Sequence, residues 1–275
     1  MRKWFIGSIT MLIVPGAIVF ALARPRADRT WIPQQTIMAH ADIRGDSVFI
    51  QHVRNFSYTA EEELTPAYDD RRYDLEKLES VWFVVTPFSR KWRGPAHTFV
   101  SFGFADSQFV GISVEARREP GERYGPLTGL FKQFELIYVI GDERDLIGSR
   151  AAFGDYDVYV YPIRTTTERM RAMFVEMLQR SNALAARPEF YNTLTNNCTS
   201  NVVDHVNHIV PNAVPHGIKT ILPGYADEVA YSLGLIDNSI PLEQARRRFR
   251  VNEQAHQFAT SPEFSKRIRI PSGAN

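Results

Sequence analysis

The stretch "GPAHTFVSFGFADSQFVGISVEARRE", residues 94–119, is the part of the chain that shows its fold most directly. Aromatic and β-branched residues fill two runs, 97–102 and 108–116, and such runs are typical of β-strands. The residues between them, 105–107, are small or polar and suit a tight turn. The stretch therefore predicts a β-hairpin whose strands belong to the core of a sheet.

Outward from this hairpin, the chain shows more strands and then two clear helices. Further strands are predicted within segments 46–58, 81–88, 136–150 and 156–163. The polar segment 59–80 is interpreted as a loop with a short helix. Apolar residues at helical spacing predict a helix over 165–186, and a second helix is expected after Cys198. Because most of the strands are consecutive, we expect an α+β fold rather than a doubly wound sheet.

The N-terminus carries a short basic start followed by an uncharged segment, residues 4–23. Twenty residues are about the length that a helix needs to cross a bilayer. The pattern Ala21-Leu22-Ala23 would also suit cleavage as a signal peptide. We expect an uncleaved single-pass anchor, with the rest of the chain on the periplasmic side of the membrane. Basic residues flank the segment on both sides, so they do not settle its orientation.

These patterns divide the chain into four parts. Residues 1–23 are the expected anchor or signal peptide, and 24–45 are expected to be a linker because they show little periodicity. Residues 46–240 are expected to form the folded domain, since they contain most of the predicted strands and helices. Residues 241–275 are expected to be a basic tail, with seven Lys or Arg against three Asp or Glu. This run is interpreted as a solvated helix face or as a contact for anionic lipid headgroups.

The whole-chain composition narrows the class of protein. A hydrophobic content of 44% and a charged content of 23% are ordinary for a folded protein. A formal net charge of +1 argues against a dedicated nucleic-acid binder. The 275 residues contain one cysteine, Cys198, so the chain forms no internal disulfide.

Cys198 lies in "NTLTNNCTSN", residues 192–201, where Asn197 is a good helix N-cap residue. A thiol in the first turn of a helix experiences roughly half a positive charge, which favours the nucleophilic thiolate. The same N–H groups could bind the oxyanion of an acyl intermediate. The alternative is that Cys198 is a small, buried and inert side chain.

A catalytic thiol needs a base, and His97 at the start of the first hairpin strand is the best candidate. A third group must orient the imidazole, and Ser113 and Glu115 on the second strand could both face it; we favour Glu115. The alternative for His97 is a purely structural histidine. His205 and His208 have the weak spacing of a metal pair, so we expect neither a metal nor a cofactor.

At this point a resemblance becomes specific. The segments "AHTFVSFGF", "PEFYNTLTNNCTSN" and "LPGYADEVAYSLGLID" have the order and spacing of the Lnb N-terminal periplasmic domain family, DUF4105, over roughly residues 46–240. The resemblance implies a permuted papain-like fold of the NlpC/P60 type, with histidine before cysteine. It implies Cys198 as nucleophile, His97 as base and Glu115 as third member. We also expect Asn197, Thr199, Tyr191 and Ser113 to bind substrate or the oxyanion.

The resemblance further implies acyl transfer from an ester. The enzymes that name the family move a fatty acyl chain from the lipid-linked glycerol of a lipoprotein to the amine of its N-terminal cysteine. The expected partners are therefore a membrane lipid or lipoprotein substrate and the bilayer itself. Two other functions stay open, namely a cell-wall peptidase or amidase and a non-catalytic binding domain of the envelope.

Overall fold

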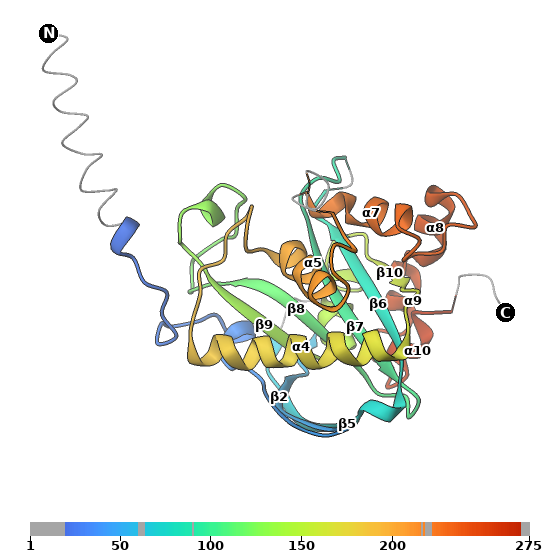
Figure 1. Ribbon diagram of the computed structural model, residues 1–275, viewed down its shortest axis with the longest axis horizontal. Helices are drawn as coiled ribbons and strands as arrows, with labels where there is room; N and C mark the ends of the chain where they lie inside the picture. The colour runs from blue at the N-terminus through green and yellow to red at the C-terminus, as the bar shows by residue number, and fades with distance from the viewer. Residues whose placement is uncertain (1–19, 60–63, 90, 216, 218–221, 271–275) are drawn as a thin grey trace, which may run out of the picture.

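The computed structural model describes residues 20–59, 64–89, 91–215, 217 and 222–270, which fold around one large sheet (Figure 1). Seven strands follow one another across the sheet in the order β1 (His40–Arg44), β2 (Ser47–Arg54), β9 (Glu135–Gly141), β8 (Phe109–Arg117), β7 (Ala96–Phe104), β6 (Leu78–Pro87) and β10 (Tyr159–Pro162). An eighth strand, β5 (Tyr68–Asp74), pairs with β2 outside this order. The short strands β3 (Ser57–Tyr58) and β4 (Leu64–Thr65) form a separate ribbon.

The predicted hairpin is confirmed as β7 and β8, joined by the turn at residues 105–107. All nine residues of β7 are buried, which explains why its sequence is nearly continuous in apolar and small residues. The strand pairs are antiparallel, except that β2 meets β9 through one parallel pair, Arg54 with Gly141. The fold is therefore of the expected α+β class, with a large sheet packed against separate helices.

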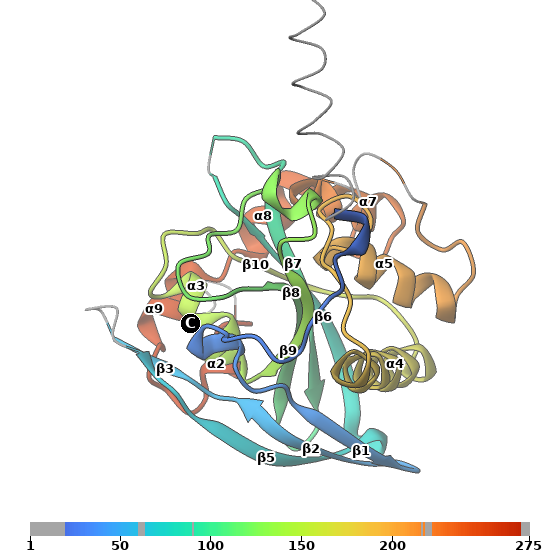
Figure 2. The same cartoon turned by 90° about the vertical axis from the view of Figure 1, so that its left-hand side faces the viewer.

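The two hairpin strands separate at one end of the sheet. β7 and β8 pair only from Val100 with Ile112 to Gly103 with Phe109. Beyond Val100, β7 continues to Ala96 while paired with β6, and β8 continues to Arg117 while paired with β9. The sheet is therefore forked between β7 and β8, and side chains from both of its faces can meet in the fork. The course of the two strands can be followed in Figure 2.

Helices cover both faces of the sheet (Figures 1 and 2). One face carries α4 (Thr167–Ala186), α5 (Cys198–Ile209) and α7 (Ala226–Ser232). The other face carries α2 (Glu143–Leu146), α3 (Gly148–Ala151), α9 (Asn252–Gln257) and α10 (Phe264–Arg267). Helix α8 (Leu242–Phe249) lies beside β10, and the 3-10 turns are η1 (Pro33–Gln35), η2 (Leu75–Lys77), η3 (Thr128–Leu130) and η4 (Pro223–Tyr225). The sheet thus separates two apolar cores.

The expectation that residues 24–45 form a linker is wrong for most of this segment. Trp31 and Gln35 are buried, and β1 extends the sheet beyond β2. The backbone of Ala41 is bound on both sides by the Asn182 amide of α4, at 3.0 and 2.7 Å. A strand of five residues with two buried alanines nearby leaves little periodicity to detect, which is why the sequence concealed it.

The expected basic tail is also part of the folded body as far as Ile270. Arg246 is buried and holds the carboxylate of Asp227 through two hydrogen bonds of 2.9 and 3.0 Å. Val251 and Phe264 pack into the core beside α2 and α3. The basic run is therefore not simply a solvated helix face, because one of its arginines is used to fasten α8 to α7.

Two other expectations need comment. Segment 59–80 contains the strand β5, which the sequence concealed because polar residues such as Asp70 and Arg72 lie on its exposed side. Within the described ranges, no helix is both long and apolar enough to cross a membrane. Residues 4–19 of the expected membrane segment lie outside those ranges.

Candidate functional site

Cys198 is the first residue of α5, and the predicted cap is present. The Asn197 side chain accepts hydrogen bonds from the backbone N–H groups of Thr199 and Ser200, at 2.8 and 2.9 Å. The Ser200 hydroxyl accepts one in return from the Asn197 N–H, at 2.8 Å, which completes a capping box. The cap thus binds the backbone N–H groups of Thr199 and Ser200. The backbone N–H of Cys198 has no hydrogen-bond partner among the described residues.

The thiol of Cys198 is buried, with an exposed fraction of 3%. Burial raises the pKa of Cys198 above its ordinary value, although hydrogen bonding from Thr98 and Thr199 acts in the opposite direction. The helix start was expected to favour a thiolate, and that expectation is wrong for the resting protein. Desolvation in the packed core is the largest influence on the pKa of Cys198, and it favours the neutral thiol.

This raised pKa predicts how Cys198 reacts with iodoacetamide. Only the thiolate is alkylated, so the rate should rise about tenfold per pH unit from pH 6 past pH 9, with no plateau near neutrality. Mass spectrometry of Cys198 at timed intervals measures the rate, and the same chain unfolded in urea supplies the exposed thiol as control. A plateau between pH 6 and 7 in the folded protein alone would contradict a neutral resting thiol.

His97 lies on the other wall of the fork and is part of a hydrogen-bonded relay. Its Nε2 atom is 2.7 Å from the hydroxyl of Ser113, and that hydroxyl donates to Oε1 of Glu115 at 2.8 Å. Nε2 lies 3.8 Å from the same carboxylate oxygen. Glu115 was expected to contact His97 directly, but the serine stands between them because residues 113 and 115 project from the same face of β8.

The relay determines which ring nitrogen of His97 carries a proton. Glu115 is an ionised acceptor, since its pKa is about 2. Ser113 gives its single proton to Glu115, so its oxygen must accept a proton from Nε2. The assignment follows from the hydrogen-bond network, and it leaves Nδ1 unprotonated. His97 is thus presented as a base through Nδ1.

The charges around the relay come from elements that lie far apart in the sequence. Burial alone would raise the pKa of Glu115, but the Arg150 guanidinium, 3.1 Å away, and the charges of His97 and Arg54 lower it. Gln35 donates to the second carboxylate oxygen at 3.0 Å. Burial, helped by Arg150 and opposed by Glu115, lowers the pKa of His97 to about 4. The imidazole is therefore neutral at pH 7.

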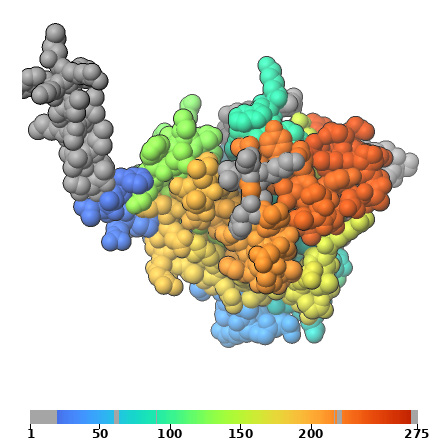
Figure 3. Space-filling view, turned by 45° about the horizontal axis from the view of Figure 1, so that its top comes forward, coloured from blue at the N-terminus to red at the C-terminus, as the bar shows by residue number. Residues whose placement is uncertain are grey.

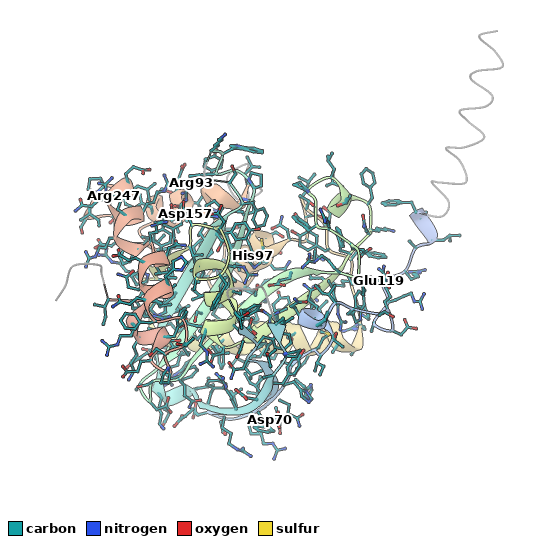
Figure 4. The ribbon with its side chains drawn as sticks, turned by 180° about the vertical axis from the view of Figure 1, so that it is seen from behind. Asp70, Arg93, His97, Glu119, Asp157 and Arg247 are labelled. Carbon is teal, nitrogen blue, oxygen red and sulfur yellow. The ribbon has the colours of Figure 1, made fainter. Side chains whose placement is uncertain are left out.

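Cys198 and His97 line one cavity of about 570 Å³ in the fork, together with Glu115, Tyr191 and Arg150. Figure 4 shows His97 in the interior, between Arg93 and Asp157 on one side and Glu119 on the other. The two predicted partners approach from opposite faces of the sheet, and no hydrogen bond joins them in the described part of the chain. The structure thus brings them into one cavity without direct contact.

The remaining predicted residues have more specific positions than the sequence could indicate. The Asn197 side chain accepts the two N–H groups of the cap and donates to the Thr193 carbonyl, at 2.7 Å. The Thr199 hydroxyl bonds that of Thr98, at 2.9 Å. The Tyr191 hydroxyl lies 3.2 Å from that of Tyr124 on the cavity wall. Ser113 belongs to the relay.

His205 and His208 are occupied by a structural contact. Their Nδ1 atoms lie 3.1 and 2.7 Å from the same oxygen of Glu176, and the Nε2 atom of His205 is 2.8 Å from the Tyr138 hydroxyl. Among the residues that the structure describes, no group of three or more His, Cys, Asp or Glu side chains could hold a metal ion. These histidines therefore join α5 to α4 and β9.

Sequence reasoning missed Gln35, Arg150 and Thr98. Gln35 lies in the supposed linker, and Arg150 lies in the short helix α3, whose sequence has no distinctive motif. Thr98 stands next to His97, but its side chain points to the opposite face of the strand and toward α5. Alternation along the predicted strand could have identified Thr98 as the residue facing the helix that starts at Cys198.

Comparison with known proteins gives one match. The family model described as Lnb N-terminal periplasmic domain matches residues 64–224, a range that includes the fork, His97 and Cys198. No curated protein and no solved structure matches the chain. The match covers more than half of the chain and contains His97, Ser113, Glu115 and Cys198, whereas the cavity-lining Gln35, Arg54 and Tyr58 precede it.

Proposed function

Because the chain belongs to the Lnb N-terminal periplasmic domain family, we propose that it is a thiol enzyme of the cell envelope that transfers or hydrolyses the acyl groups of lipid-linked esters. The observation that carries the proposal is the fork cavity. It combines a thiol at a helix start with an imidazole whose tautomer is set by the Ser113–Glu115 relay. The order of His97 before Cys198 also supports a permuted papain-like architecture.

In the proposed acylation step, the ester carbonyl enters the fork between the thiol and the imidazole. Nδ1 of His97 takes the thiol proton as the sulfur attacks the carbonyl carbon. The carbon–oxygen bond to the glycerol then breaks, and the leaving alkoxide takes that proton from His97. The products are an alcohol and an acyl thioester on Cys198. The step requires the imidazole and the thiol to approach, since catalytic hydrogen bonds often tighten only when substrate is bound.

In the second step an amine or a water molecule attacks the thioester carbonyl. His97 takes the proton of the attacking group, the carbon–sulfur bond breaks, and the sulfur is reprotonated by His97. The free N–H of Cys198 is the group best placed to donate to the oxyanion in both steps, because the N–H groups of Thr199 and Ser200 already serve the cap. Asn197, which was expected to bind substrate or the oxyanion, supports this donor by holding the first turn of α5 through the cap.

A membrane substrate is supported by exposed apolar side chains around the mouth of the cavity. Loops 88–95 and 118–132 carry exposed Phe88, Trp92, Leu127 and Phe131, and Phe88 lines the cavity itself. Figure 3 shows both loops standing out from the surface. Soluble domains rarely expose several large apolar side chains together unless they contact a partner or a membrane.

The first described residues of the chain, from Phe20 on, lie at the same edge as loop 118–132 (Figures 1 and 2). Lys132 holds the carbonyl of Phe20 at 2.9 Å and lies 4.7 Å from the centre of its ring. We propose that residues 4–23 anchor the chain in the membrane, with the domain on the extracytoplasmic side. The loops and the cavity mouth would then face the bilayer that holds the substrate.

The test of the proposal is to trap the thioester. The chain is mixed with a 4-nitrophenyl fatty acyl ester and quenched in acid, and intact-protein mass spectrometry should show one acyl group on Cys198. His97→Ala should slow its formation by about 100-fold or more, and His256→Ala, at an exposed histidine away from the fork, serves as control. If no adduct forms while peptide amides are cleaved, the enzyme is a peptidase. If neither reacts, the domain is not catalytic.

A further inference from the structure

A second cavity lies on the α5 face of the sheet, behind the thiol. It has a volume of about 170 Å³, is lined by residues of α4, α5, α7, β6 and β7, and is partly open to the surface. All of its lining residues are apolar except Thr165, Arg169 and Thr199. Part of its wall is formed by valines of α5 and alanines of α7, namely Val202, Val203, Val206, Ala226 and Ala230. Such a lining offers water few hydrogen-bonding partners and suits an apolar ligand.

The cavity reaches almost to the catalytic position. Thr199, which lines it, follows Cys198 directly, and its hydroxyl is 3.9 Å from the Cys198 sulfur. The same hydroxyl bonds that of Thr98 across the gap between α5 and β7, at 2.9 Å. Among the contacts of the described residues, the hydroxyls of Thr98 and Thr199 are therefore the only polar groups between the Cys198 sulfur and the apolar wall of the cavity.

We propose that this cavity receives the hydrocarbon chain of the acyl group whose carbonyl carbon is bonded to Cys198. The inference rests on the proposed acyl transfer and adds the site that selects the acyl chain. Apolar cavities of about 150 Å³ take up benzene, so this one has room for a segment of roughly six carbons. The ester enters through the fork, and its chain passes the threonine pair to the opposite face of the sheet.

The size of the cavity predicts a dependence on chain length. Each methylene that moves from water into apolar surroundings improves binding about fourfold, so a hexanoyl ester gains up to about 250-fold over an acetyl ester. Longer chains gain less per methylene because the cavity is full. The polar backbone of a peptide would gain nothing from this wall, whereas every methylene of an acyl chain would, which is why an acyl chain is the favoured occupant.

The experiment compares kcat/KM for 4-nitrophenyl acetate, hexanoate and dodecanoate in the full chain. Ala230→Phe fills the cavity, because Ala230 is buried and lines it. The hexanoate-to-acetate ratio should then fall at least tenfold. Ala185→Phe, on the exposed side of α4, adds the same ring elsewhere and should leave the ratio unchanged. An unchanged ratio in Ala230→Phe would overturn the inference.

Two further measurements keep the result clear. If Ala230→Phe does not fold, Val206→Ala enlarges the cavity, and the preference should shift toward dodecanoate; no shift would overturn the inference. Calorimetric binding of dodecanoate to Cys198→Ala is independent of catalysis. Suppose that dodecanoate binds Cys198→Ala, that the additional Ala230→Phe change abolishes this binding, and that the parent chain processes no ester. The cavity would then be an acyl-chain site, but the proposed acyl transfer would be refuted. Ester turnover by the parent chain without dodecanoate binding would support acyl transfer and overturn the cavity as the acyl-chain site.

Discussion

Cys198→Ala is expected to reduce acyl transfer by at least about 1000-fold, because the proposed thioester cannot form without the sulfur. The other groups of the proposed site position or activate this sulfur atom. The relay sets the tautomer of His97, and the cap orients α5 so that its first residue lies in the cavity. With the sulfur removed, these groups have no nucleophile to activate. Only slow attack by water on a bound ester remains.

The measurement is release of 4-nitrophenol together with the loss of the acyl adduct by mass spectrometry. Thr195→Ala is the matched control, since Thr195 is exposed, lies three residues before Cys198 and its hydroxyl has no bond among the described residues. Circular dichroism should show that both variants unfold within a few degrees of the parent chain. Retention of more than a tenth of the turnover by Cys198→Ala would exclude a covalent mechanism through this residue.

The second large effect concerns stability. Asp145→Ala is expected to lower the free energy of unfolding by about 3–5 kcal/mol, because it leaves a buried arginine without its counter-ion. Asp145 is fully buried and accepts two hydrogen bonds from Arg54, at 2.8 and 2.9 Å. It also accepts the backbone N–H of Phe56 and the hydroxyl of Tyr58, both at 2.9 Å. The alanine variant would leave all of these donors unsatisfied.

This carboxylate joins β2, β3 and α2 beside the cavity, so its loss should also loosen the wall formed by Arg54 and Tyr58. Urea unfolding followed by fluorescence measures the change. Glu263→Ala removes one partner of an exposed pair with Arg267 and should cost less than about 1 kcal/mol. Equal losses in the two variants would show that Asp145 is not the buried anchor that its contacts indicate.

The sequence predicted the local features well, and the reasons are visible in particular residues. Asn197 and Ser200 begin α5 at Cys198 through contacts within four residues. The hairpin of β7 and β8 follows from its apolar strands and short turn. The 20-residue helix α4 follows from its apolar stripe. The strands β1 and β5 were missed because edge strands with polar or small residues carry a weak pattern.

The site itself depended on contacts between distant parts of the chain. Gln35 reaches Glu115 across 80 residues, and Thr98 reaches Thr199 across 101. The predicted residues His97, Glu115 and Cys198 line one cavity, but the hydroxyl of Ser113 lies between His97 and Glu115, which were expected to touch. The expected thiolate is a neutral thiol, since burial is a property of the packed core rather than of the helix start.

The sequence by itself determined where α5 begins, which strands form the hairpin and that one cysteine lies beside a helix cap, because capping and periodicity act over a few residues. Only the tertiary structure decided that β7 and β8 part into a fork, that His97 reaches Glu115 through Ser113, and that an apolar cavity lies behind Thr199. Those features depend on strand register and on desolvation, which exist only once segments a hundred residues apart are packed together.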